Sequence, residues 1–170
     1  MTALLLILVP LIGGLVSFFV KQGSHAKLWS FVVSLVTLAA MSVNLLMNDE
    51  AGRSFTAEWL PQLGSSFALQ MDGASVLLCS LTALCFPIIF ASTWKSSYAS
   101  PNSFYGLMLL AQAGITGVFL AADGLLFYFF WELALIPVYF LCSIWGGEKR
   151  IAVTFKFFVY TFVGSLLMLI

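Results

Sequence analysis

The chain has 170 residues, of which 62% are hydrophobic and 8% are charged, and its formal net charge is zero. Soluble domains carry roughly 25% charged residues, so this composition excludes an ordinary soluble protein. Without a net charge the chain has no bulk attraction for nucleic acid, and we expect no nucleic-acid partner. We expect a membrane protein with the lipid bilayer as its surroundings.

Six long apolar runs predict the secondary structure, because about 20 apolar residues are needed to cross the hydrocarbon core of a bilayer. The predicted helices are Thr2–Val20, Leu28–Met47, Gly73–Trp94, Phe104–Ala122, Gly124–Trp145 and Ile151–Ile170. The first run lacks the basic start and the small-residue cleavage site of a signal peptide, so we interpret it as a span. The predicted fold class is an all-α membrane protein with about six transmembrane helices, in a single domain over residues 1–170.

The largest segment outside the bilayer is predicted at residues 48–72. Within it, Phe67, Leu69 and Met71 alternate with Ala68 and Gln70, which is the period-two pattern of a strand. We expect a short hairpin on the outer face that covers the helix ends and carries no chemistry.

No residue pattern in the chain predicts a metal site or a redox group. Cys79, Cys85 and Cys142 lie in apolar runs, where cysteines behave as small hydrophobic residues. The lone histidine, His25, lies in a short polar loop between two runs. We therefore expect this chain to bind no cofactor and no metal.

Basic residues in the loops predict the orientation. Five Lys/Arg residues lie in alternate loops (Lys21, Lys27, Lys95, Lys149 and Arg150), and only Arg53 lies in the other loops. The acidic loop residues of the opposite side are Asp49, Glu50, Glu58, Asp72 and Asp123. Because basic loops stay in the cytoplasm, we expect the N-terminus outside and the loop at residues 146–150 inside.

Glu132 is the only acidic residue within the long apolar runs, and it lies near the middle of the fifth. A carboxylate at that depth costs about 2.5–3.5 kcal/mol even on insertion scales. Two interpretations stay open, a group that transfers a proton and a structural partner of another helix. Because intramembrane ionisable residues mark proton relays and ion paths, we favour proton transfer.

Helical spacing places three polar side chains on the face of Glu132. They are Tyr128, Tyr139 and Ser143, at offsets of −4, +7 and +11. In the same helix Pro137 cannot donate a hydrogen bond to the carbonyl four residues earlier. A freed acceptor within a turn of a buried carboxyl is a place where water can enter, so these four residues are expected to support proton transfer.

Lys156 is the second charge inside an apolar run, about five residues into the sixth predicted helix. A lysine at that depth either snorkels to the cytoplasmic surface or acts as a proton relay near the inner mouth of a path. On the same helix Thr154, Thr161 and Ser165 form a stripe with hydrogen-bonding capacity.

Two further residues, Gln112 and Asp123, are expected to support the proton-transfer site. Gln112 lies one turn before Thr116 on the fourth predicted helix, and this pair either hydrates a path or joins helices. Asp123 stands directly before the fifth helix, on the outer side.

The stretch from Phe119 to Leu141 resembles a signature of the antiporter-like subunits of respiratory complex I, NADH:quinone oxidoreductase. Lys156–Ser165 is similar to the next helix of that family, and Met71–Ser75 to the start of its third. From Trp131 to Phe140 the sequence is more similar to subunit M, the bacterial counterpart of mitochondrial subunit 4, than to subunit L or the Mrp antiporter chains.

This resemblance implies a proton-translocating subunit of the membrane arm, without redox centres, in the bacterial inner membrane. NADH and quinone would be used elsewhere in the complex, and the other membrane-arm subunits would be its partners. The resemblance gives Glu132 a place in the proton pathway, coupled to a lysine on a seventh helix. It also implies that the chain is the opening part of an inverted-repeat bundle.

Two alternatives stay open, an Mrp-type cation/proton antiporter subunit and a membrane scaffold that transports nothing. The sixth predicted helix stops at Ile170 without a polar cap or an interfacial anchor. We therefore expect the chain to be the N-terminal part of a longer protein, and not to be catalytic by itself.

Overall fold

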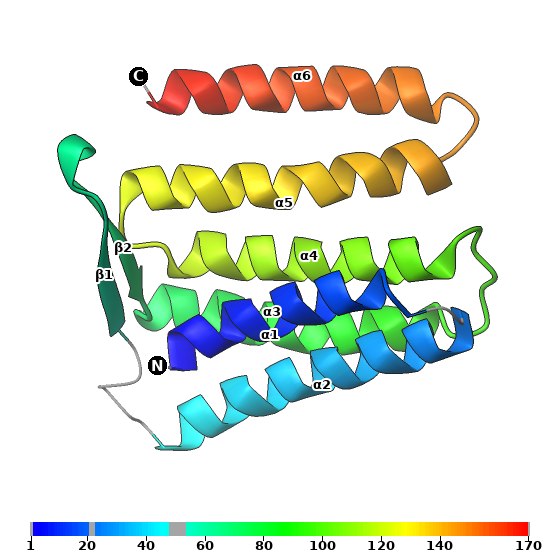
Figure 1. The fold of residues 1–170 in the computed structure, drawn as a ribbon, viewed down its shortest axis with the longest axis horizontal. Coiled ribbons are helices and arrows are strands. Elements are labelled where there is room, and N and C mark those ends of the chain that lie inside the picture. Colours follow the sequence, from blue (N-terminus) through cyan, green and yellow to red (C-terminus); the bar gives the residue numbers. More distant parts are fainter. Residues whose placement is uncertain (1, 21–22, 48–53, 170) are drawn as a thin grey trace.

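A computed structural model describes residues 2–20, 23–47 and 54–169 of the chain. Within them, helices lie side by side in a bundle, and a two-stranded hairpin stands at one end (Figure 1). The elements are α1 (Thr2–Ser17), α2 (Gly23–Met47), β1 (Ser54–Leu60), the 3-10 helix η2 (Pro61–Leu63), β2 (Ser65–Gln70), α3 (Gly73–Ser92), α4 (Pro101–Leu120), α5 (Gly124–Trp145) and α6 (Arg150–Leu169). All six predicted helices are confirmed.

Five of the described helices, α2 to α6, are long and apolar enough to cross a membrane. Helix α1 has 16 residues. At 1.5 Å per residue it is about 24 Å long, which is short of the roughly 30 Å hydrocarbon core. It ends at Ser17 and not at the predicted Val20, because the chain leaves the helix through a tight turn with hydrogen bonds to residues three positions back.

The polar flanks of two apolar runs also belong to helices. Helix α2 begins at Gly23, so His25 lies exposed on its first turn and not in a loop as predicted. Helix α4 begins at Pro101, three residues before the predicted start, because proline fits the first position of a helix. An apolar run marks only the part of a helix that contacts lipid or the protein core. Polar residues at the ends of a helix are therefore not predicted from the length of the run.

Helix α4 occupies the centre of the bundle, and glycines permit its close contacts with two neighbours. A Cβ at Gly14 of α1 would lie 3.0 Å from the carbonyl oxygen of Gly106, and one at Gly117 would lie 2.3 Å from the ring of Phe130 on α5. Small residues at such contacts are typical of helices packed within membranes. As a result, 56% of the α4 span is buried, whereas only 11% of the α6 span is buried at the edge of the bundle.

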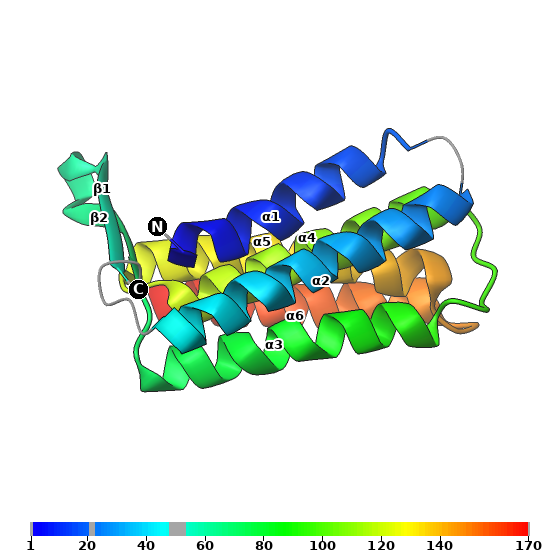
Figure 2. The same ribbon diagram turned by 90° about the horizontal axis from the view of Figure 1, so that it is seen from below.

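The predicted hairpin is confirmed, with β1 and β2 paired antiparallel. It projects from the end of the bundle where α1 begins (Figure 2). Leu69 of β2 and Met71, which directly follows β2, are buried, at 1% and 5% exposed. The backbone N–H of Ala122 donates to the carbonyl of Ala68 at 2.9 Å, so the hairpin is joined to the connection between α4 and α5.

Charge is distributed between the two ends as the sequence predicts. The connections α3–α4 and α5–α6, which carry Lys95, Lys149 and Arg150, lie at the end opposite the hairpin (Figure 1). At that end Lys27 Nζ donates to the carbonyls of Trp94 and Ser96, at 3.0 and 2.7 Å. The orientation prediction also used four loop residues that lie outside the described residues, namely Lys21, Asp49, Glu50 and Arg53. Which end faces the cytoplasm stays a prediction.

Candidate functional site

Glu132 lies half-buried near the middle of α5 and is bonded to α6. The Ser165 hydroxyl donates to Oε1 of Glu132 at 2.5 Å. Ser165 is only 6% exposed, although most of α6 is exposed. A hydrogen bond between a hydroxyl and a carboxylate is among the stronger ones in proteins, so this contact links the acidic residue to the outermost helix.

The same hydroxyl has a second partner. Ser165 Oγ lies 2.9 Å from the carbonyl oxygen of Phe162, one turn back on α6. A serine carries one hydroxyl hydrogen and two lone pairs. It can therefore donate to a charged Glu132, or accept from a protonated Glu132 while donating to Phe162.

A groove between α5 and α6 runs beside this pair. It has a volume of about 270 Å³ and is lined by Phe127, Trp131, Tyr160, Thr161, Gly164, Ser165 and Met168. A second groove of about 230 Å³ lies where α4, α5 and α6 meet, and Trp131 and Thr161 line both. Their walls are almost wholly apolar, so the hydroxyls of Ser165, Thr161 and Tyr160 are the polar groups that α6 brings to this region.

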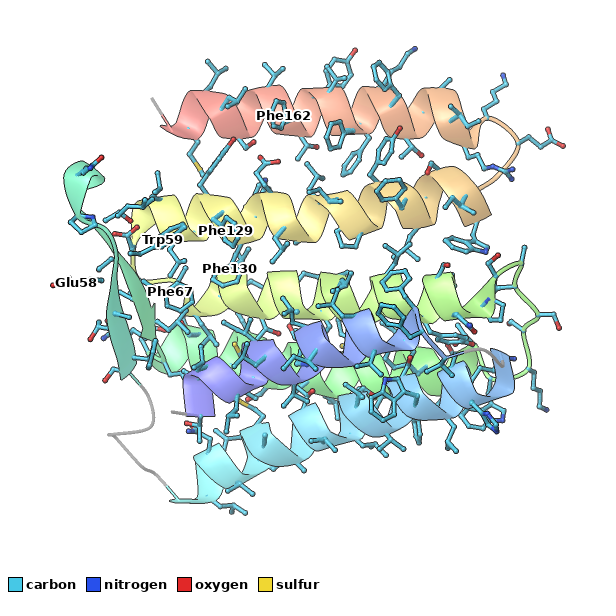
Figure 3. All side chains as sticks on the ribbon, viewed as in Figure 1. Glu58, Trp59, Phe67, Phe129, Phe130 and Phe162 are labelled. Carbon is cyan, nitrogen blue, oxygen red and sulfur yellow. The ribbon has the colours of Figure 1, made fainter. Side chains whose placement is uncertain are left out.

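Aromatic and polar side chains determine how α5 and α6 meet. Tyr139 packs edge-to-face on Phe158, with ring centroids 5.1 Å apart, and Phe158 stacks on Phe162 at 5.9 Å. Thr154 and Ser165 are the buried polar residues of α6. Figure 3 shows the side chains between the two helices, with Phe162 labelled on α6.

At the hairpin end of α5 an aromatic cluster fixes the helix against the hairpin. Phe130 lies 6.2 Å from Phe67, and Trp59 lies 5.7 Å from Phe129, measured between ring centroids. Figure 3 labels these four residues where β1 and β2 meet α5. Edge-to-face aromatic pairs add specific stabilisation to the area that they bury.

Of the predicted supporting residues on α5, Tyr139 lies on the side of Glu132 that contacts α6, whereas Ser143 forms a hydrogen bond within its own helix. Tyr139, two turns on, faces α6 as Glu132 does. Tyr128, one turn before, is half-buried. The Ser143 hydroxyl donates to the carbonyl of Phe140 at 3.2 Å, within its own helix.

Pro137 lies buried inside α5, which continues unbroken to Trp145. Proline has no backbone N–H, so the carbonyl of Leu133 loses its usual helical donor one residue after Glu132. The structure therefore keeps Pro137 within the helix, little more than one turn after Glu132, as the sequence predicts.

Lys156 is exposed and lies away from Glu132. It lines a groove of about 520 Å³ at the start of α6, together with Glu148, Lys149 and Arg150. Nine residues of α6 separate Lys156 from Ser165, which is roughly 14 Å of helical rise. The structure thus does not join Lys156 to the Glu132–Ser165 pair.

Gln112 and Asp123 occupy different surroundings. Gln112 is 0% exposed within α4, and the Thr116 hydroxyl donates to its backbone carbonyl at 2.8 Å. Asp123 accepts hydrogen bonds from the Ser65 hydroxyl at 2.7 Å and from two backbone N–H groups at the start of α5. These bonds, the Ser65 bond first, hold the pKa of Asp123 below its ordinary value, so the carboxylate is a structural cap.

The role of Ser165 is the part of the site that sequence reasoning did not assign. Its place on the polar stripe of α6 indicated hydrogen-bonding capacity, but not the partner. Within the described residues no group of three or more His, Cys, Asp or Glu side chains could hold a metal ion, and the three cysteines are free thiols.

The packed apolar helices and the bonded intramembrane carboxyl define a multi-pass membrane protein. Residues 121–170, which include Glu132 and Ser165, match a family profile described as NADH:quinone oxidoreductase/Mrp antiporter, transmembrane region. The chain is thus similar to antiporter-like membrane subunits.

Individual relatives match nearly all of the chain. The F(420)H(2) dehydrogenase subunit M of Methanosarcina mazei is 42% identical over 99% of this chain and 35% of its own length. The NADH-quinone oxidoreductase subunit M of Escherichia coli is 34% identical over 97% of this chain and 36% of its own length. The chain therefore spans about a third of the relatives that it matches.

A solved structure confirms the fold. A chain of respiratory complex I from Thermus thermophilus superposes with a TM-score of 0.85 and 28% identity, over 99% of this chain and 34% of that chain. The apolar helices and the bacterial relative together confirm the expected multi-pass location in the inner membrane.

Proposed function

We propose that this chain is the opening part of a proton-translocating subunit in the membrane arm of a quinone-reducing respiratory complex. The observation that carries the proposal is the bond from Ser165 to Glu132, near the middle of α5. The names of the relatives, subunits M of NADH-quinone oxidoreductase and F(420)H(2) dehydrogenase, support it. The subunit holds no redox group, NADH and quinone react elsewhere in the complex, and its partners are the other membrane-arm subunits.

Glu132 is the proton carrier in this proposal. A carrier must hold a proton at one moment and release it at another, so both charge states of the carboxyl need partners. The Ser165 hydroxyl suits both, because it donates to the carboxylate and accepts from the acid. The change needs only rotation of one hydroxyl hydrogen, and neither helix has to move.

Energy for transport then comes from a change in the electrostatic surroundings of the carboxyl. A nearby cation favours the charged form of a carboxyl, and withdrawal of the cation favours the protonated form. A proton moved against 100 mV costs about 2.3 kcal/mol. One unit of change in proton affinity corresponds to about 1.4 kcal/mol, so a change of about two units suffices.

Substitution of Glu132 in the full-length protein tests the proposal. Glu132→Gln keeps the shape and the bond to Ser165 but cannot ionise, so it should assemble normally and lose most proton translocation. Glu132→Asp should retain part of it. Glu58→Gln, on the exposed face of the hairpin, is the matched control and should behave as the parent. Membrane vesicles assayed for substrate-driven acidification give the readout, and parental pumping by Glu132→Gln would refute the role.

The family profile also supports a second candidate, since its description includes Mrp antiporters. In that case the subunit exchanges a cation for protons through the same carboxyl. Replacing sodium by choline in the vesicle assay separates the two functions. Acidification independent of sodium supports the respiratory subunit, and loss of exchange without sodium supports the antiporter.

A further inference from the structure

A basic groove lies at the start of α6, at the end of the bundle opposite the hairpin (Figure 1). Its volume is about 520 Å³, and it is lined by Glu148, Lys149, Arg150, Ile151, Ala152, Val153 and Lys156. Three of these side chains are cations and one is a carboxylate, which leaves a formal charge of +2. We call it the α6 groove, and the Glu132–Ser165 pair makes no use of it.

The three cations meet in one groove because α6 begins between them. The backbone N–H of Val153 donates to the carbonyl of Lys149 at 3.2 Å, which closes the first turn. Lys156 lies six residues after Arg150, roughly 9 Å further along the helix. Side chains on a helix tilt toward its N-terminus, and a long lysine stem can carry its ammonium back to the membrane surface. Lys156 therefore lines the same groove as Arg150.

The positive charge of the α6 groove is not neutralised by the part of the chain that the structure describes. Within these residues, Lys149, Arg150 and Lys156 form no ion pair with a carboxylate. Arg150 Nη1 donates to the carbonyl oxygen of Gly146 at 3.4 Å, which is an uncharged acceptor. All three cations are exposed. An incoming anion thus gains three cations and displaces no existing ion pair.

The remaining lining of the groove is apolar, which a soluble anion does not need. Ile151 and Val153 are 69% and 61% exposed, and Ala152 between them is exposed as well. The apolar surface continues along the helix at Phe155, which is 57% exposed. Since α6 is long and apolar enough to cross a membrane, this surface lies next to the charged start of a span. A ligand with a negative head and an apolar tail matches both parts.

We propose that the α6 groove binds the headgroup of an anionic phospholipid from the leaflet at the basic end of the bundle. The phosphate contacts Lys149, Arg150 and Lys156, and the acyl chains follow the exposed apolar residues of α6. Basic pockets at the ends of membrane helices suit such headgroups, because they combine charge with access to lipid. Inorganic phosphate would use the cations alone. The site does not depend on the proton-transfer role proposed for Glu132.

The test uses the full-length protein in its assembled complex, reconstituted in phosphatidylcholine nanodiscs. A small share of the lipid is a photoactivatable phosphatidylglycerol or, in a parallel sample, the matching phosphatidylcholine. Mass spectrometry after irradiation measures how much of the segment 148–156 carries lipid. The phosphatidylglycerol probe should label this segment several-fold more, and unlabelled phosphatidylglycerol should compete whereas inorganic phosphate should not.

Three results with the parent protein would overturn the proposal. Equal labelling by both lipids would show only general contact with the bilayer. Competition by inorganic phosphate would show a site for a soluble anion. Absence of labelling by either probe would show that protein covers the groove in the complex.

Substitutions test the role of the charge. Arg150→Gln removes one cation and should lower phosphatidylglycerol labelling about fivefold, the usual contribution of one basic residue near an anionic lipid surface. Arg150→Lys keeps the charge and should retain most of the labelling. Lys95→Gln is the matched control, because Lys95 is also exposed at this end but lies outside the groove. Unchanged labelling of Arg150→Gln, or an equal loss in Lys95→Gln, would contradict the proposal.

Discussion

The Ser165 hydroxyl lies 2.5 Å from Oε1 of Glu132, and this bond joins the least buried of the described candidate spans to the one acidic residue within those spans. The bond responds to the charge of Glu132, because the serine either donates to the carboxylate or accepts from the acid. When Glu132 is protonated, the Ser165 hydroxyl can still donate to the carbonyl of Phe162, at 2.9 Å. In the proposed function, protonation of Glu132 on α5 would therefore change the hydrogen bonding of the α6 backbone.

Ser165→Ala removes this hydroxyl, and we expect proton translocation to fall about tenfold while the complex assembles. Ser165→Thr keeps a hydroxyl and should restore most of the rate. The carboxyl C=O stretch of Glu132 in infrared difference spectra should shift to higher frequency in the alanine variant, because the acid loses its acceptor. Thr161→Val is the control, since Thr161 donates to Phe157 within its own helix, at 2.8 Å. Equal losses in both variants would indicate general damage to α6.

Lys156→Met should retain most of the proton translocation, because Lys156 is exposed and roughly 14 Å of helical rise from Ser165. Its larger effect should be on insertion, measured as the amount of complex in the membrane. Lys156→Arg should be nearly silent in both assays. A loss of pumping in assembled Lys156→Met comparable with that of Glu132→Gln would instead establish a relay.

The orientation predicts that a cysteine at position 149 is protected in intact cells. Lys149→Cys should react with an impermeant maleimide only after the membrane is opened, whereas Glu58→Cys on the hairpin should react at once. The measurement is the labelled fraction before and after permeabilisation. Reaction at position 149 from outside would reverse the predicted topology.

Gly117→Leu should disrupt the contact between α4 and α5, since even a Cβ at this position would lie 2.3 Å from the Phe130 ring. Overpacking of this kind costs about 1–3 kcal/mol. We expect less assembled complex and a lower Tm. Gly124→Leu is the control, because nothing lies within 4 Å of a Cβ there, and it should assemble as the parent does.

Asp123→Asn should destabilise the junction of hairpin and α5 at neutral pH. Its hydrogen bonds, that from Ser65 above all, keep the pKa of Asp123 below its ordinary value of 3.8. The contribution of the charged form is therefore complete above that value and is lost as the pH falls through the lower pKa of the folded state. The Tm difference between parent and variant should be largest at neutral pH and vanish in strong acid. A difference independent of pH would refute the charge as its cause.

The sequence predicts helices well where an apolar run and a capping residue coincide. The run of α5 ends where the helix does, and Asp123 caps its first turn, so Gly124 and Trp145 are predicted without error. The beginning of α2 is missed because polar residues such as His25 extend a helix without adding to its apolar run. Length alone also overstated α1, whose last apolar residues leave the helix after Ser17.

Within the site, periodicity gives the face of a helix but not its neighbour. The spacing from Glu132 to Tyr139 correctly indicates one face, and both residues meet α6. Ser165 could not be paired with Glu132 from spacing, because the rotation and offset between two helices depend on packing such as Tyr139 on Phe158. The same limit applies to Gln112, because spacing alone does not show that its side-chain amide has no hydrogen-bond partner among the described residues.

The cap at Asp123 has an electrical consequence for Glu132. Asp123 is bonded to the hairpin, so it fixes the start of α5 relative to the hairpin. Nine residues separate the cap from Glu132, which is roughly 14 Å, or about half of a 30 Å core. In the proposed function, a proton at Glu132 would have traversed about half of the transmembrane voltage, worth about 1.2 kcal/mol at 100 mV. The hairpin would thereby set the electrical distance of the carboxyl and divide the voltage almost equally between the loading and the release of the proton.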